Sequence, residues 1–167
     1  MAARVAVAGD AVNAVPNAHA ILVHFPLGLL STAVVADLVG AVFLKRPGLN
    51  RTALWLWVGG TGLLVATYLT GRDAAADVRT PGMAHALINA HWTWAWYTVL
   101  YFGAVTISRI GLRWIRSEPR PVAQIAVLLA AGVGLFLLLQ TADRGGQLVY
   151  QYGVGVAAPS PVPLQNR

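Results

Sequence analysis

The four histidines are the residues of this sequence with the clearest chemical potential, because each stands at the start of a long apolar run. His19 and His24 lie in "NAHAILVHFP", and His85 and His91 lie in "MAHALINAHW". Imidazole is a common axial ligand of haem iron. An ionisable side chain inside a membrane span is also costly enough to suggest a function. What these residues can do depends on the elements that position them.

Those elements are predicted to be membrane-spanning helices. The 167 residues are 57% hydrophobic and 11% charged, whereas soluble domains carry about 25% charged residues. Four apolar runs reach the length of about 20 residues that crosses a bilayer as a helix, at residues 21–44, 52–71, 86–108 and 122–142. We predict an all-α membrane protein, a bundle of four transmembrane helices.

The predicted division of the chain follows from these runs. Residues 1–20 form an outer N-terminal segment, and residues 21–142 form the transmembrane bundle. Asp143, Gly145 and Gly146 are expected to end the fourth helix, because aspartate and glycine are unfavourable within helices. Residues 143–167 are then an outer C-terminal cap followed by an extended, proline-rich tail.

The basic residues predict how the bundle is oriented. The two connections on one side of the membrane hold most of the positive charge, with a single acidic residue; their basic residues are Lys45, Arg46, Arg51, Arg109, Arg113, Arg116 and Arg120. Short loops rich in lysine and arginine remain in the cytoplasm. Both termini are therefore predicted to be periplasmic, in a multi-pass protein of the bacterial inner membrane. The positive charge indicates orientation and not nucleic-acid binding.

The first and third spans run in the same direction, so all four histidines gather near the outer surface. His24 and His91 lie deeper than His19 and His85 by about 7–9 Å, at 1.5 Å per residue. This spacing is too small for two stacked haems. At most one haem b fits, most simply between His24 and either His91 or His85. Its propionates would face outward, towards the arginines of that side: Arg72, Arg79 or Arg144.

Two other interpretations of the histidines stay open. In the first, His19 and His85 lie at the membrane interface while His24 and His91 hydrogen-bond to neighbouring helices. In the second, the histidines bind an ion such as copper or zinc, although no HxxxH or HExxH spacing is present. A stripe of small residues on the first span predicts that His24 faces into the bundle; it comprises Gly28, Thr32, Ala36 and Gly40.

Asp37 is the only acidic residue within the spans, roughly 20 Å deeper than His24. It either takes part in proton uptake or forms a structural pair with Arg46, Arg51 or a helix hydroxyl. The absence of cysteine excludes disulfides, thiolate metal sites and iron–sulfur clusters. No nucleophile with a partnering base is evident, and inspection of the sequence identifies no internal repeat.

Four segments resemble a known family when they are read in order: "HAILVHFPLGLLSTAVVADL", "GGTGLLVATYLTG", "HALIN" and "DRGGQLVYQYGVGV". They are similar to the DUF2231 family of bacterial four-helix membrane proteins, over residues 19–156. The resemblance implies a setting near redox modules such as c-type cytochrome domains. It also implies that His24 and His85 are the recurrent histidines, with His19 a frequent first one and His91 less general.

We therefore predict a small integral-membrane subunit of a respiratory or photosynthetic redox complex, without independent catalytic activity. It would bind one haem b or contact quinone near the outer surface. The haem iron would be held by His24 and His85, with His91 and His19 as further ligand candidates. The expected partners are the lipid bilayer, other subunits, and quinone or a periplasmic cytochrome. The alternative is a purely structural or assembly subunit without a cofactor.

Overall fold

The computed structural model describes residues 18–41, 47–77, 81–115 and 121–156, and these are almost entirely helical. The elements are α1 (Ala18–Leu22), α2 (His24–Val39), α3 (Pro47–Asp77), the 3-10 turn η2 (Gly82–Ala84), α4 (His85–Ile115) and α5 (Pro121–Tyr152). Predictions that concern residues 1–17 and 157–167, or Lys45, Arg46, Arg79, Arg116 and Arg120, fall outside the described residues.

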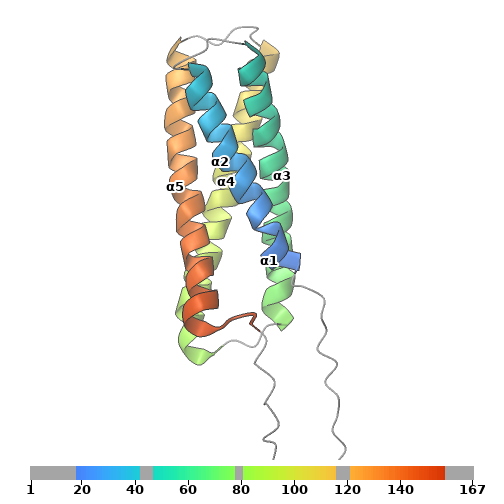
Figure 1. Ribbon diagram of the computed structural model, residues 1–167, viewed down its shortest axis with the longest axis vertical. Coiled ribbons are helices and arrows are strands. Elements are labelled where there is room, and N and C mark those ends of the chain that lie inside the picture. Colours follow the sequence, from blue (N-terminus) through green and yellow to red (C-terminus); the bar gives the residue numbers. More distant parts are fainter. Residues whose placement is uncertain (1–17, 42–46, 78–80, 116–120, 157–167) are drawn as a thin grey trace, which may run out of the picture.

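The helices form a four-membered bundle in which the chain runs alternately up and down (Figure 1). In that view α2 lies in front of α4, with α3 on one side and α5 on the other, so α2 and α4 occupy one diagonal of the bundle. The first turn of α1, the last turn of α5 and the start of α4 share one end, which we call the histidine end. We call the other the opposite end.

Proline explains why the first span is divided into α1 and α2. The Val23 amide still donates to the His19 carbonyl at 3.0 Å, so the chain stays helical across the junction. Pro26 has no amide hydrogen to donate to the Leu22 carbonyl, and its ring bends a helix at the preceding turn. Pro26 is fully buried. The bend leaves α1 packed against α3 at the histidine end.

The core is a column of apolar side chains to which all four long helices contribute. Its buried members are Leu30 and Ala33 of α2, Trp57 and Leu64 of α3, Phe102 of α4, and Ala131 and Leu138 of α5. Many large apolar side chains instead point outward, for example Trp55, Ile107 and Leu129. An apolar exterior around an apolar core is expected for a bundle that packs against lipid.

Three of the described helical stretches are long and apolar enough to cross a membrane: Ala18–Val39, Arg51–Ala75 and Ile125–Tyr152. The prediction of an all-helical membrane protein is therefore confirmed at this coarser level. Helix α4 is long enough, at 31 residues, but it is not among the three. Its sequence is rich in tryptophan, tyrosine and histidine, which lower its mean hydropathy.

Two expectations about the helices are wrong. The fourth helix does not end at Asp143, because α5 continues to Tyr152 and is capped by Gly153 at φ 65°. The Gly153 amide donates to the Val149 carbonyl at 3.0 Å, which closes a left-handed cap that glycine adopts readily.

The prediction that the small-residue stripe turns His24 into the bundle is also wrong. Along the stripe Gly28 and Thr32 are exposed, Ala36 is half-buried and only Gly40 is buried. Helix α2 instead buries a face made of Pro26, Leu30, Ala33 and Asp37, which leaves the His24 side chain exposed.

Candidate functional site

Two of the four histidines, both at the histidine end, form hydrogen bonds to other helices. His19 of α1 bonds through Nδ1 to the Thr67 carbonyl of α3, at 2.9 Å. His91 of α4 bonds through Nδ1 to the Thr141 carbonyl of α5, at 3.1 Å. A carbonyl oxygen only accepts hydrogen bonds, so Nδ1 carries the hydrogen in each ring. In the neutral imidazole the lone pair is then on Nε2, the nitrogen that can bind a metal.

Each of these rings lies against a glycine of the helix to which it bonds. A Cβ added at Gly71 would stand 2.8 Å from Cε1 of His19, and one added at Gly145 would stand 3.2 Å from Cε1 of His91. Any larger residue would push the ring away from the helix. The two glycines thus allow the imidazoles to sit deep between the helices.

Arg144 lies beside the His91 ring in sequence position, because it directly precedes Gly145, the residue that the ring contacts. Helix α1, which carries His19, lies at the same end of the bundle. Arg144 donates to the carbonyl and to Oε1 of Gln140, at 2.8 and 2.7 Å, and its guanidinium lies 4.4 Å from the centre of the Trp94 ring. We call His19, His91, Thr67, Thr141 and Arg144 the histidine cluster.

Hydroxyl groups extend this cluster into the bundle. Thr98 of α4 is fully buried. Its Oγ1 has one hydrogen, which the Trp94 carbonyl at 2.7 Å and Oγ1 of Thr141 at 2.8 Å are both placed to accept. Thr141 in turn donates to the Leu137 carbonyl at 2.9 Å. The carbonyl-bearing residue that orients His91 is therefore itself held by a network between α4 and α5.

The other two histidines do not join the cluster. His24 and His85 are exposed, and each bonds a carbonyl within its own turn: His24 to Ile21 at 3.4 Å and His85 to Gly82 at 2.9 Å. The sequence favoured His24 with His85 as iron ligands, whereas the structure bonds His19 and His91 to other helices. His24 is exposed because α2 presents Leu30 and Asp37 to the core.

Asp37 forms a second buried site near the opposite end, and its partner is not one that the sequence suggested. Arg109 of α4 donates through Nη1 to Oδ2 at 2.6 Å and through Nη2 to Oδ1 at 2.7 Å. Trp57 of α3 donates through Nε1 to Oδ2 at 2.8 Å, and the Arg109 guanidinium lies 5.0 Å from the centre of the Trp57 ring. The side chain of Asp37 is 5% exposed and that of Arg109 is 11% exposed.

The sequence analysis missed Arg109 because it counted this residue with the cytoplasmic loop charges. The structure instead includes it in α4, more than one turn before the helix ends at Ile115. The signal that could have predicted this pair is an arginine at the end of one apolar run and an aspartate at the matching depth of another.

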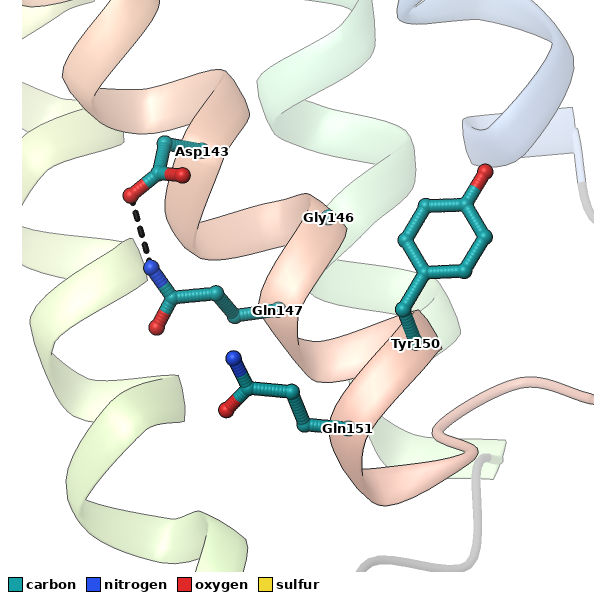
Figure 2. Close-up of a pocket in the computed structure, with 5 residues that line it drawn as sticks. All are labelled: Asp143, Gly146, Gln147, Tyr150 and Gln151. Atoms are coloured by element: carbon teal, nitrogen blue, oxygen red, sulfur yellow. Dashed lines mark hydrogen bonds between the residues drawn. The ribbon is translucent and has the colours of Figure 1, made fainter.

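A shallow, open depression also lies on the outside of α5, lined by Asp143, Gly146, Gln147, Tyr150 and Gln151 (Figure 2). Its one internal hydrogen bond runs from Gln147 Nε2 to Asp143 Oδ2, at 2.7 Å. Tyr150 is 90% exposed, and neither histidine of the cluster lines the depression. It is a surface feature of one helix and not a converging site.

Within the described residues no group of three or more histidine, cysteine, aspartate or glutamate side chains could hold a metal ion. This part of the chain therefore contains no site in which side chains alone would supply three or more metal ligands. A haem is different in this respect, because the porphyrin supplies four nitrogens and the protein supplies only the axial ligands. Two imidazoles are the donor set that such a group takes.

Comparison with known proteins gives one family. The model of a family described as "Predicted membrane protein (DUF2231)" matches residues 16–158. No curated protein matches the chain. No solved structure matches it either.

Proposed function

The chain belongs to the DUF2231 family of predicted membrane proteins, and on that premise we propose that it is a small four-span subunit of a membrane redox complex that holds one haem b between His19 and His91. The observation that carries this proposal is that these two histidines, at the same end of the bundle, are each tethered through Nδ1 to a carbonyl of another helix. The proposal replaces the pair His24 and His85 with the pair His19 and His91, and keeps the location at one end of the bundle.

The aromatic residues support a fourth span along α4. Trp92 and Trp94 lie near the histidine end of α4, and Trp114 lies near its other end and is 88% exposed. The 20 to 22 residues between them correspond to about 30–33 Å of helix, which equals the hydrocarbon thickness of a bilayer. Tryptophans at two such levels form interfacial belts. Two charges lie between them: Arg109, which is neutralised by Asp37, and Arg113, which directly precedes Trp114 at the end of the helix.

The charges support an orientation with the histidine end outside. Arg51 and Arg113 lie towards the opposite end, next to the connections in which the sequence has four more basic residues. The positive-inside rule then assigns the opposite end to the cytoplasm. In a bacterial inner membrane the histidine cluster would face the periplasm, where a periplasmic cytochrome or a quinone could exchange electrons with it.

The chemistry of the cluster suits a haem with two axial imidazoles. Histidines that ligate a metal usually donate the other ring hydrogen to a carbonyl or carboxylate, which fixes the tautomer and the ring direction. Thr67 and Thr141 supply such carbonyls. Arg144, in the same cluster, would pair with a propionate. When bound, the haem would supply one-electron transfer, while the residues of the chain orient the ligands and balance charge.

The test is a dithionite-reduced minus oxidised visible spectrum of the purified protein, recorded for the wild type and four single variants. We expect a sharp reduced α-band in the wild type that is lost in His19→Ala and in His91→Ala. The matched controls are His24→Ala and His85→Ala, which should keep the band because both residues are exposed.

Three results would contradict the proposal in different ways. A flat spectrum from folded wild-type protein would show that it binds no haem. A band lost only in the two control variants would show that His24 and His85 are the ligands. A band that survives all four substitutions would assign the haem to another protein in the preparation.

A structural or assembly subunit without a cofactor remains the second candidate function. The described residues contain no buried side-chain nitrogen or oxygen without a hydrogen-bond partner. The histidine cluster is thus able to serve as inter-helix hydrogen bonding alone. A flat spectrum together with co-purifying membrane proteins would favour this function.

A further inference from the structure

The first spans of the two helical hairpins carry matching residues at matching positions. The sequence reads Asn-Ala-His at 17–19 and again at 89–91, an offset of 72 residues. With the same offset Leu30 corresponds to Phe102, and both are fully buried in the core. Asp37 corresponds to Arg109, and these two residues form the ion pair across the bundle.

The second helices of the hairpins match as well, with an offset of 74 residues. The members of each pair make the same contact, and the residue of the first hairpin is named first. The carbonyls of Thr67 and Thr141 each accept from a histidine. That histidine's ring lies against Gly71 or Gly145, and the Leu30 and Phe102 side chains lie against Gly60 and Gly134. The backbone contacts are thus made twice, by corresponding residues.

The arrangement in space agrees with this correspondence. Each of α2 and α4 packs against both α3 and α5, and both hairpins start at the histidine end (Figure 1). A half-turn about the long axis of the bundle therefore exchanges α2 with α4 and α3 with α5. This is a parallel repeat, with an axis along the membrane normal. The sequence analysis identified no repeat because the identical residues are scattered and the offset changes from 72 to 74 between the two helices of a hairpin.

The ion pair is where the two halves differ in a way that matters for assembly. If the halves had the same residue at this position, two carboxylates or two guanidiniums would meet on the axis in a low-dielectric environment. Instead Asp37 pairs directly with Arg109, and Trp57 contacts both residues by donating to Asp37 and stacking on Arg109. The position equivalent to Trp57 is the buried Ala131.

From these observations we infer that the bundle consists of two copies of one helical hairpin joined in a single chain. We further infer that Asp37 and Arg109 make the first hairpin select the second hairpin, and not another first hairpin, as its partner. A buried ion pair contributes little net stability compared with apolar packing, and its best-attested use is to fix register or partner choice. Here the first hairpin of one chain pairs with the second hairpin and not with the first hairpin of another chain. This role does not depend on whether the histidine cluster holds a haem.

The first experiment exchanges the charges in the full chain. Asp37→Arg and Arg109→Asp each place like charges on the axis, and we expect the ratio of folded to unfolded protein to fall by about 100-fold or more in each. The double variant D37R/R109D restores opposite charges, and its yield of monodisperse protein in detergent should recover most of the loss. The matched control is the exposed Arg72→Asp, which should leave the yield unchanged.

A second measurement keeps the inference testable if Trp57 does not tolerate the reversed pair. The D37R chain and the R109D chain are produced together with different affinity tags. Exchange of hairpins between them forms one native and one reversed ion pair, so the two chains should co-purify and their joint yield should rise above either alone. Wild-type chains with the two tags give the baseline for co-purification.

The outcomes separate clearly. Recovery in the double variant, or co-purification of the two single variants above the wild-type baseline, supports partner selection by the charges. Failure of both, or single variants that fold as well as the wild type, overturns it.

Discussion

The hydrogen bonds of the four imidazoles separate them into two kinds of residue. His19 and His91 each bond a carbonyl of another helix, whereas His24 and His85 bond carbonyls of their own turns. A bond within one turn does not constrain the ring relative to the rest of the bundle. A bond between helices fixes the ring direction, which a metal ligand requires. For this reason our proposal places the haem ligands in the first pair.

Asp37 shows the same dependence on exact partners. Its Oδ2 accepts from both Trp57 and Arg109, while Oδ1 accepts from Arg109 alone. The three residues come from three helices. A carboxylate in a membrane interior is retained only when each oxygen is satisfied, and this arrangement satisfies both.

At the residue scale we predict that Trp57→Phe destabilises the protein by about 1–3 kcal/mol, the cost of removing a hydrogen-bond donor from a buried charged group. Phenylalanine keeps a ring under Arg109, so the loss reports mainly on the indole N–H. The measurement is thermal or denaturant unfolding in detergent.

The control for this prediction is two residues away on the same helix. Trp55 is 65% exposed, and Trp55→Phe should change the unfolding free energy by no more than about 0.5 kcal/mol. Equal effects of the two substitutions would mean that the Trp57–Asp37 hydrogen bond contributes nothing specific.

At the level of elements, glycines decide how closely the helices approach the side chains of their neighbours. Gly60 receives the Leu30 side chain and Gly134 receives the Phe102 ring, with 2.7 and 2.9 Å to the nearest atom from an added Cβ. Towards the histidine end Gly71 and Gly145 receive imidazoles instead. Close approach at glycine is a general feature of membrane helix packing; here the approaching group is a side chain of the facing helix.

The second prediction therefore concerns Gly71→Ala and Gly145→Ala. Each adds a methyl group within 2.8 or 3.2 Å of an imidazole carbon, and overpacking of this kind costs about 1–3 kcal/mol. We expect lower thermal stability in both variants, and loss of the reduced α-band if the ring can no longer reach the haem.

The matched controls are Gly62→Ala and Gly132→Ala, at exposed positions where an added Cβ has no neighbour within 4 Å. Alanine favours the helix there by about 0.5–1 kcal/mol, so these variants should be as stable as the wild type or more so. A control that loses as much stability as Gly71→Ala would show that the imidazole contact is not the cause.

The whole molecule has two chemically different ends. The histidine end holds the histidine cluster, and the opposite end holds the ion pair of Asp37 and Arg109, with basic connections beyond it. Apolar side chains cover the outside of the helices between these ends. This asymmetry is what a protein with a fixed orientation in the membrane needs.

The orientation is open to a direct test because the sequence contains no cysteine. We predict that Met83→Cys, which precedes α4 and replaces a residue that is 81% exposed, reacts with a membrane-impermeant maleimide in intact cells. Trp114→Cys, at the far end of α4, should react only after the membrane is permeabilised. Arg51→Cys serves as the control for the cytoplasmic side.

Labelling of Met83→Cys and Trp114→Cys from the same side would contradict a membrane-spanning α4. Labelling with the two sides reversed would keep the span and invert the orientation.

The sequence by itself determined that the protein is an all-helical membrane protein, and its motifs indicated the family. The helical class follows from the length and composition of local apolar runs, which do not depend on how the helices pack against one another. The family follows from four sequence motifs read in order. The ends of the spans were less certain, because Gly145 and Gly146 resemble a helix end in sequence but continue as helix within α5. There, packing against His91 outweighs the low helix propensity of glycine.

Only the tertiary structure decided which histidines form hydrogen bonds to other helices and which residue neutralises Asp37. Both depend on how each helix is rotated about its own axis, and that rotation is set by side-chain packing between segments 48 to 72 residues apart. The repeat was invisible for the same reason. The two halves share positions and contacts, such as Leu30 on Gly60 and Phe102 on Gly134, but few identical residues, because packing constrains the shape of a contact more than its chemistry.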